Sequence, residues 1–284
     1  MAVASEDRVE GHEFLFTSQD FERISMLIHR HAGIALSASK KEMVYSRLAR
    51  RLRANGLTCF NDYLALLERG DRQEWEEFTN SLTTNLTAFF REAHHFPILA
   101  QHVRRHHGRP VTLWCCAAST GEEPYSMAMT MAEAFDTLTP PVRILATDLD
   151  TQVLARARSG IFLMERLERM PQQQVRRFFH KGTGSSAGMA RVRPELRSMV
   201  CFRQLNLLDE TWPVRGPFDA IFCRNVMIYF DKPTQRTILE RFLPLLGADG
   251  LLFAGHSESF HHAVDLFRPC GKTVYAPQPG AAHG

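Results

Sequence analysis

From Val111 onwards, apolar strand-like segments alternate with amphipathic helical segments, and this alternation restricts the chain to few folds. Strands are expected at 111–117, 143–148, 201–206, 218–223 and 250–256, and helices at 122–135, 151–158 and 232–246. Such alternation predicts an α/β fold, with a mostly parallel sheet covered by helices on both faces. A further strand with Val274 and Tyr275 could form an antiparallel edge. A ligand is expected beyond the carboxyl ends of the parallel strands.

The N-terminal part has a different hydrophobic pattern: residues 18–82 show helical periodicity and no convincing strand. Helices are expected near 18–33, 39–54 and 60–67, with a fourth containing Trp75, Phe78 and Leu82. We therefore expect an all-helical domain over 1–82, a linker over 83–110 and an α/β domain over 111–284.

The second of these helices is strongly basic, with six bases and one acid over residues 40–53. Its apolar side holds Val44, Leu48 and Leu52. About 110° away gather the bases Lys40, Arg47, Arg50 and Arg51. This group is either the solvated face of a packed helix or a docking surface for an acidic partner. The second interpretation stays open because the neighbouring turns lack acids that would neutralise the bases.

Residues 160–200 interrupt the alternation with an excursion too long for an ordinary connection. The excursion has a charge of +5, from eight Lys or Arg and three Glu. Its glycine-rich turn at 182–188 is followed by alternating polar and apolar residues at 189–193, which are typical of an edge strand. An inserted hairpin or small β-subdomain is the expected structure.

The ends of the first two strands favour an adenosine ligand. After the first strand, residues 117–124 form a turn of small residues that lacks both G-x-G-x-x-G and the lysine of a phosphate-binding loop. The second strand ends at Asp148, where a carboxylate can accept hydrogen bonds from ribose hydroxyls, whereas Asp150 suits the cap of the next helix. An adenosine ligand without pyrophosphate makes S-adenosylmethionine the leading candidate.

Composition excludes several other classes of protein. The net charge of +3 is too small to indicate a nucleic-acid partner by itself. The six cysteines form no C-x-x-C pair, which favours a reducing compartment and no structural metal. No apolar run is long enough for a membrane span, and the polar N-terminus does not resemble a signal peptide. A cytoplasmic protein is the default expectation.

Two further segments carry polar groups suited to a site. The segment before the sheet contains Asn85, Thr87 and Arg91, which suit a lid that presents a guanidinium to a carboxylate. The fourth strand is followed by Arg224 and Asn225. Amino-methylases of nucleic-acid bases carry an Asn/Asp-Pro-Pro-aromatic stretch at this point, and its absence here argues against base methylation.

Five ordered motifs identify a resemblance that covers nearly the whole chain. They are TTNLTAFFREAHHF (83–96), LWCCAASTGEEPYS (113–126), ATDLDTQVLARARSGI (146–161), FDAIFCRNVMIYFDK (218–232) and GLLFAGHSES (250–259). With these motifs the chain resembles the CheR family of chemotaxis receptor methyltransferases. The resemblance implies a Rossmann-like domain that methylates receptor glutamates, consuming S-adenosylmethionine and releasing S-adenosylhomocysteine.

The resemblance also implies roles for individual residues. Arg91 and Tyr229 would be catalytic, with Tyr229 beside the reacting sulfonium. The expected cofactor contacts are Asn85, Thr87, Arg91, Glu123 (preferred over Glu122), Asp148, Asn206, Leu207, Cys223, Arg224 and Asn225. The expected receptor contacts are Lys40, Arg47, Arg50 and Arg51 on the basic helix, and Arg191, Arg193 and Arg197 in the excursion, which could hold a receptor C-terminal peptide. The rival functions are methylation of nucleic acid or of another protein, and cofactor binding without turnover.

Overall fold

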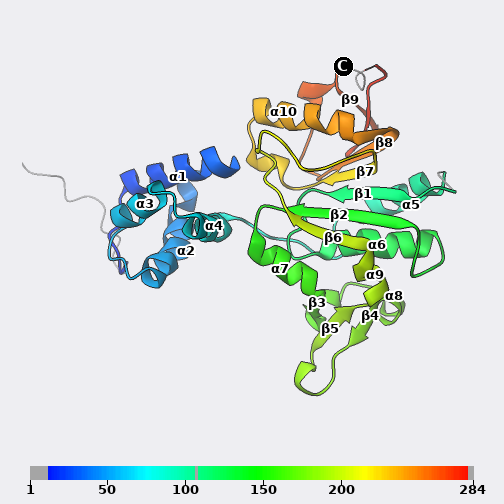
Figure 1. The fold of residues 1–284 in the computed structure, drawn as a ribbon, viewed down its shortest axis with the longest axis horizontal. Helices are drawn as coiled ribbons and strands as arrows, with labels where there is room; N and C mark the ends of the chain where they lie inside the picture. The colour runs from blue at the N-terminus through cyan, green and yellow to red at the C-terminus, as the bar shows by residue number, and fades with distance from the viewer. Residues whose placement is uncertain (1–11, 106–107, 281–284) are drawn as a thin grey trace, which may run out of the picture. The chain divides into compact units, whose positions relative to one another are not determined.

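A computed structural model describes residues 12–105 and 108–280 of the chain. The chain divides into two compact units, the first ending at Thr84 and the second beginning at Asn85 (Figure 1). The first unit is helical, with α1 (Ser18–Ala32), the short helix η1 (Ala38–Lys40), α2 (Lys41–Ala54), α3 (Phe60–Glu68) and α4 (Arg72–Leu82). A reciprocal Thr17–Asp20 capping box begins α1, and Gly33 ends it in a left-handed conformation.

A buried polar network joins α2 to α4 and changes the interpretation of the basic helix. Arg51 Nη2 lies 2.6 Å from Glu74 Oε2, and the Tyr63 hydroxyl donates to Glu74 Oε1 at 2.7 Å. Arg47 donates to the carbonyls of Ser81 and Thr83 at 3.1 and 2.7 Å. The neighbouring turns of the helix hold no acids for these bases, but α4 supplies Glu74 and Glu77 to Arg51 from across the bundle.

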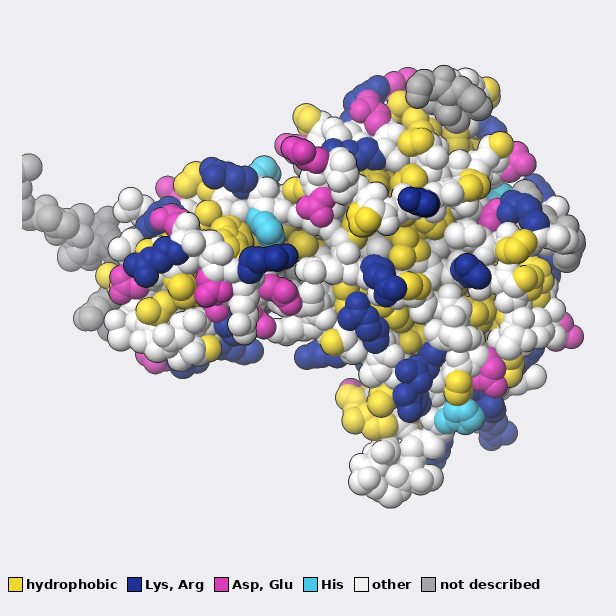
Figure 2. Space-filling view, viewed as in Figure 1, with side chains coloured by type: hydrophobic (Ala, Val, Ile, Leu, Met, Phe, Trp, Pro, Cys, Tyr) yellow, Lys and Arg dark blue, Asp and Glu magenta, His cyan; other side chains and the backbone are white. Residues whose placement is uncertain are grey.

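The remaining bases of this face are open to solvent to different degrees, Arg50 being exposed and Lys40 half-buried. On the face drawn in Figure 2, the helical unit shows basic and acidic side chains interspersed. A docking surface on this basic face would therefore rest on Lys40 of η1 and Arg50 of α2 more than on Arg47 and Arg51, which are bonded within the unit.

The second unit is built on a seven-stranded sheet of order β6-β2-β1-β7-β8-β10-β9. The strands are β1 (Val111–Cys115), β2 (Val142–Asp148), β6 (Val200–Gln204), β7 (Phe218–Cys223), β8 (Leu246–Ala254), β9 (Phe267–Gly271) and β10 (Val274–Pro277). The first five are parallel, as the alternation predicts. Strand β10 is antiparallel to its neighbours, as expected, but the edge strand is β9.

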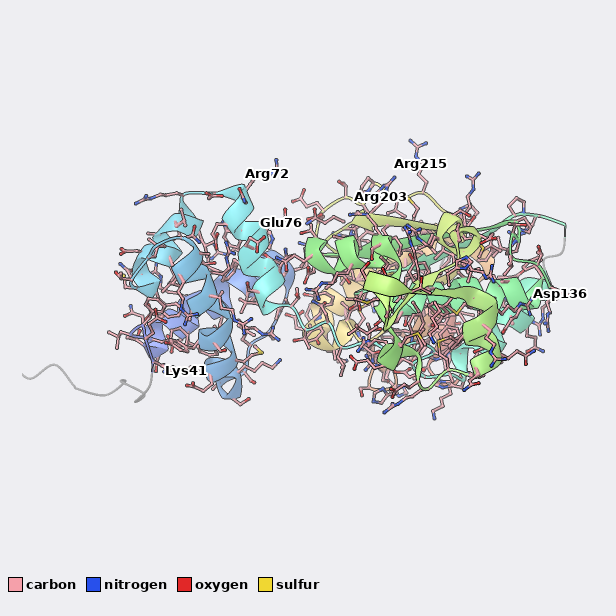
Figure 3. The ribbon with its side chains drawn as sticks, turned by 90° about the horizontal axis from the view of Figure 1, so that it is seen from below. Lys41, Arg72, Glu76, Asp136, Arg203 and Arg215 are labelled. Atoms are coloured by element: carbon pink, nitrogen blue, oxygen red, sulfur yellow. The ribbon has the colours of Figure 1, made fainter. Side chains whose placement is uncertain are left out.

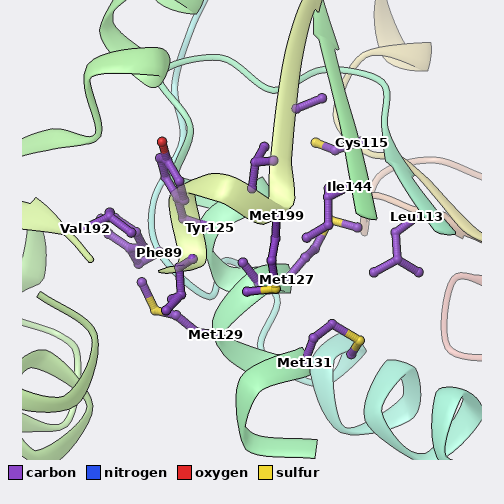
Figure 4. Close-up of a cluster of buried hydrophobic side chains, with 14 of the residues drawn as sticks. Phe89, Leu113, Cys115, Tyr125, Met127, Met129, Met131, Ile144, Val192 and Met199 are labelled. Atoms are coloured by element: carbon purple, nitrogen blue, oxygen red, sulfur yellow. The ribbon is translucent and has the colours of Figure 1, made fainter. Parts of the chain in front are cut away.

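Two hydrophobic clusters cover opposite faces of this sheet, because alternate residues of each strand point to opposite sides. The first cluster joins Leu113 and Phe222 to the buried sides of α5 (His95–Arg104), α6 (Glu122–Ala134) and α7 (Thr151–Ser159). Figure 4 shows methionines of α6 among side chains from β1 and β2 in this cluster. The second cluster joins Trp114 and Ile221 to α10 (Lys232–Phe242).

Helix α5 lies within the segment for which we expected only a linker. It contributes Leu99 and Val103, both fully buried, to the first cluster. Pro97 stands in its first turn, where the missing amide hydrogen costs no helical hydrogen bond. The segment after Asn85 is therefore part of the second unit.

The excursion forms a small subdomain with its own three-stranded antiparallel sheet, of order β3-β5-β4. Its elements are β3 (Ile161–Leu163), η2 (Met164–Leu167), α8 (Gln172–Phe178), β4 (Phe179–Lys181), η3 (Gly184–Ser186), β5 (Met189–Val192) and α9 (Pro194–Met199). The expected alternation of 189–193 is present, but β5 is the central strand and not an edge. The edges of this sheet are β3 and β4.

Candidate functional site

The candidate site lies at the carboxyl ends of β1, β2 and β7. The chain runs from β1 outwards through β2 and β6, and then returns to place β7 on the other side of β1. This reversal between β1 and β7 is a topological switch point, where open parallel sheets bind their ligands. The turn after β1, the end of β2 and the loop after β7 are therefore positioned to share one ligand.

Asp148, the last residue of β2, is held by backbone amides on both sides. Its Oδ2 accepts from Ser119 N at 2.7 Å and its Oδ1 from Asp150 N at 3.0 Å. Burial raises the pKa of Asp148 to about 6. Asp150 caps α7 as predicted, accepting from the amides of Gln152 and Val153. Asp148 itself thus retains acceptor capacity for a ligand at the strand end.

The turn between β1 and α6 needs its glycine. Gly121 has a φ of 101°, and a Cβ there would lie 3.0 Å from the Cβ of Ala157 in α7. The two glutamates that follow it point to different partners. Glu122 forms an ion pair with Arg166 of η2, whereas Glu123 Oε2 lies 2.9 Å from Arg224 Nη1. The structure thus places Glu123 beside another expected site residue and Glu122 beside the subdomain.

Residues 85–94, which we name the strap, run from the start of the second unit to α5. Near its beginning, Asn85 Nδ2 donates to Asp150 Oδ2 at 2.8 Å, and the carbonyl of Asn85 accepts from Ser119 Oγ at 3.1 Å. The carbonyl of Thr87 accepts from Arg166 at 3.0 Å. Arg91 Nη1 donates to the Leu86 carbonyl at 2.9 Å. The strap therefore places Asn85 next to the end of β2 and its loop.

The middle of the strap is anchored by an aromatic contact with the small subdomain. Phe89 packs edge-on against Phe162 of β3 and Phe179 of β4, with ring centroids 4.9 and 5.6 Å apart. Next to it, the Phe90 amide donates to Ser126 Oγ of α6 at 2.9 Å. These contacts fix the position of the strap immediately before Arg91 in the sequence.

A buried ionic cluster lies beyond Arg91. The side chain of Arg224 is fully buried, and it lies between Glu123 and Glu92, whose Oε2 is 3.4 Å from Arg224 Nη2. Arg224 Nη2 also donates to the carbonyl of Arg91 at 2.5 Å. Burial raises the pKa of Glu123 despite the attraction of Arg224. Our sequence interpretation did not single out Glu92, although it lies within one of the five motifs.

The loops after β7 and β8 are joined by a second carboxylate that the sequence interpretation missed. Glu258, largely buried, accepts from the amides of Gly255, Asn225 and Ile228 at 2.5, 2.9 and 3.3 Å. Burial raises the pKa of Glu258. Asn225 has a φ of 59°, and a Cβ at Gly255 would clash with its side chain. The position after β8 thus requires glycine.

The other expected site residues are distributed around this centre. Asn206 and Leu207 follow β6, with Leu207 buried and the Asn206 side chain accepting from the Leu208 amide at 3.0 Å. Cys223 is buried at the end of β7, and Tyr229 is half-buried in the short helix η4 (Met227–Tyr229). In the small subdomain, Arg191 of β5 is exposed, while Arg193 and Arg197 are half-buried and Arg197 donates to the Arg158 carbonyl.

These groups fit S-adenosylmethionine by their chemistry. Asp148 offers carboxylate acceptors to a ribose. The strap offers the amide of Asn85 and the guanidinium of Arg91. Buried Arg224 retains Nε without a hydrogen bond among the described residues, while its Nη1 lies against Glu123. Over the same residues, no cluster of His, Cys, Asp and Glu has the arrangement of a metal site.

Two further observations concern possible membrane-spanning helices and two exposed arginines. None of the helices in residues 12–105 and 108–280 is both long enough and apolar enough to cross a membrane. The side chains of Arg203 on β6 and of Arg215 point away from the sheet into solvent (Figure 3).

A parallel α/β sheet with an acidic residue at the end of its second strand defines the class as Rossmann-like nucleoside-cofactor domains. Family comparison is specific: residues 19–83 match the CheR methyltransferase all-alpha domain, and residues 85–276 match the CheR methyltransferase SAM-binding domain. The chain therefore belongs to the CheR methyltransferase family, and it is an S-adenosylmethionine-dependent methyltransferase.

Three similar proteins match this chain over most of its length and of their own. "Chemotaxis protein methyltransferase 2" of Pseudomonas aeruginosa is 55% identical over 94% of this chain and 96% of its own length. The "Chemotaxis protein methyltransferase" of Escherichia coli is 58% identical over 90% of each chain. The protein of that name from Salmonella typhimurium is 56% identical over 90% of this chain and 89% of its own length.

Proposed function

We propose that this protein methylates glutamate side chains in the cytoplasmic region of chemotaxis receptors, and so serves sensory adaptation. The observation that carries the proposal is the match of both units, in order, to the two domains of one family, with chemotaxis methyltransferases at 55–58% identity. The geometry at the ends of β1, β2 and β7 is consistent with this reaction.

The proposed reaction needs no acid or base catalyst from the residues of this chain. A glutamate has an ordinary pKa near 4.3, so it is already a carboxylate at neutral pH and needs no general base. S-adenosylmethionine supplies a sulfonium-bound methyl group, and its S–C bond breaks as the glutamate forms an O–C bond in an in-line displacement. The task of the protein is alignment and exclusion of water, and alignment alone can contribute about 7–11 kcal/mol.

The proposed roles of individual residues are those that the family resemblance implies, and the placement of each group supports them. Asp148 would bind the ribose, and Asn206 and Leu207 would border the adenine. Asn85, Thr87 and Arg91 would close over the methionine end of the cofactor, above Glu123, Cys223, Arg224 and Asn225. Arg91 and Tyr229 would face the reacting atoms, Tyr229 from the loop after β7. Arg224 is too deeply buried and too fully engaged with Glu92 and Glu123 to reach a receptor side chain.

Two surfaces could bring the receptor to this site. On the helical unit, Lys40 of η1 and Arg50 of α2 would attract the acidic methylation region. In the small subdomain, a receptor C-terminal peptide would add a strand at β3 or β4, since β5 is already paired on both sides. Exposed Arg191, with Arg193 and Arg197, would supply positive charge to such a peptide.

The decisive experiment is incubation with labelled S-adenosylmethionine and receptor cytoplasmic fragments. Label that appears on the receptor and is released by mild base indicates methyl esters of glutamate. Label on nucleic acid in a filter assay would support the rival substrate. Cofactor binding without methyl transfer to any substrate would indicate a binding module and not an enzyme. Label on nucleic acid, or binding without methyl transfer, would refute the proposal.

A further inference from the structure

Glu92 is an acid of the candidate site for which we have given no role so far. Its Oε1 accepts from the backbone amide and Nδ1 of His256, at 3.1 and 2.9 Å, and from Asn225 Nδ2 at 3.4 Å. Its Oε2 lies 3.4 Å from Arg224 Nη2 and 3.9 Å from His95 Nδ1. A single carboxylate thus connects the strap to the loops after β7 and β8 and to the start of α5.

The charge of Glu92 is stabilised in this position. Burial by itself would raise its pKa, but the hydrogen bonds from His256, the attraction of Arg224 and the bond from Asn225 outweigh it and lower the pKa to about 2. Glu92 is therefore a carboxylate at every pH at which the protein would work. Its partner Arg224 is fully buried, so the loss of this negative charge would leave Arg224 with Glu123 as its one ion-pair partner among the described residues.

The backbone on both sides of Arg91 is held in an unfavourable conformation. Phe90 has a φ of 52° and Glu92 a φ of 53°, in the left-handed region that residues other than glycine seldom adopt. Such conformations persist where surrounding contacts impose them. Here the contacts are the Phe90 amide on Ser126, the Arg91 carbonyl on Arg224 and the carboxylate of Glu92.

We infer that Glu92 is a positioning residue, which fixes the guanidinium of Arg91 for the cofactor by holding the strap against Arg224 and His256. The inference rests on the proposed function, because it takes Arg91 as a cofactor contact. Glu92 touches neither the cofactor nor the receptor in this mechanism. Its effect passes through Arg91, and that distinguishes it from a residue that only stabilises the fold.

A double-mutant cycle on S-adenosylhomocysteine affinity tests this inference. Glu92→Gln keeps the size of the side chain and removes its charge, and we expect it to weaken binding about five- to tenfold by calorimetry. In an Arg91→Ala background, Glu92→Gln should change the affinity less than twofold, because residues that act through one another are not additive. Glu92→Asp, which keeps the charge, should restore part of the affinity. Glu210→Gln, an exposed acid in the loop after β6, is the matched control and should bind as the wild type.

Turnover gives a second readout. Glu92→Gln should lower kcat at least tenfold while the KM for receptor changes less than twofold. If Glu92→Gln does not fold, His256→Ala removes a donor to Glu92 from an exposed position and takes its place in the cycle. Equal losses of affinity in both backgrounds, or none in either, would overturn the inference and leave the proposed function intact. Wild-type protein that binds S-adenosylhomocysteine but methylates no receptor would refute the proposed function, while the cycle would still decide the role of Glu92.

Discussion

Asp148 gives the sharpest prediction, because both its charge and its titration should control cofactor binding. Replacing it with asparagine keeps the shape of the side chain but removes the charged acceptor. Hydrogen bonds to a charged group contribute about 1.5–3 kcal/mol, which corresponds to roughly a 10- to 150-fold rise in Kd. The raised pKa adds a pH dependence: the carboxylate gains a proton as the pH falls through about 6, and the binding charge is lost on the acid side.

If only the ionised form binds, the apparent Kd of the wild type should be roughly tenfold larger at pH 5 than at pH 7.5, given a pKa of about 6. Asp148→Asn should bind weakly and show no such dependence. The assay is calorimetry with S-adenosylhomocysteine at both pH values, with circular dichroism to confirm folding. Asp136→Asn, at an exposed position beyond the end of α6, is the control. Wild-type affinity in Asp148→Asn, or equal wild-type Kd values at the two pH values, would refute the reasoning.

The remaining predictions concern the receptor surfaces and the helical unit. Arg51→Ala should lower the free energy of unfolding by about 3 kcal/mol in a denaturant titration, because it leaves the Glu74 carboxylate buried without its ion-pair partner. Arg50→Glu should raise the receptor KM and reduce its salt dependence at unchanged cofactor affinity, and an unchanged KM would make α2 merely a solvated face. Peptides copied from receptor C-termini should bind with micromolar Kd, and shortening the 182–188 turn should abolish this; no binding would leave the subdomain purely structural.

Periodicity was sufficient to predict most of the fold. The strands around the site and the cap at Asp150 can be predicted from short-range patterns, because the geometry of a strand or a helix start constrains which residues occur at neighbouring positions. Helix α5 was not predicted, although its Pro97 stands in the first turn, where proline is tolerated. Alternation at 189–193 reveals that one side of β5 is buried, but the number of strands beside it depends on pairing at a distance.

The candidate site was predictable only where its residues are placed by local sequence patterns. Residues at strand ends, such as Asp148, can be placed from the fold class alone. The partners of charged side chains cannot, because Glu74 is 23 positions from Arg51 and His256 is 164 positions from Glu92. A search of neighbouring turns finds neither pair. The buried ionic cluster is therefore a property of the tertiary structure, which only the packed strap and loops reveal.

Phe89 makes the small subdomain inseparable from the strap. Its ring belongs by sequence to the segment that carries Arg91, yet it is buried against Phe162 and Phe179 of the inserted sheet. An excised subdomain would expose this aromatic surface to water. An enzyme without the subdomain would lose the two aromatic contacts that hold Phe89 of its strap. The insertion therefore behaves as a structural part of the catalytic domain, so whole-segment deletion or transfer to another protein would confound docking with catalysis. Substitutions on exposed positions of the subdomain, such as Arg191, leave that aromatic contact in place.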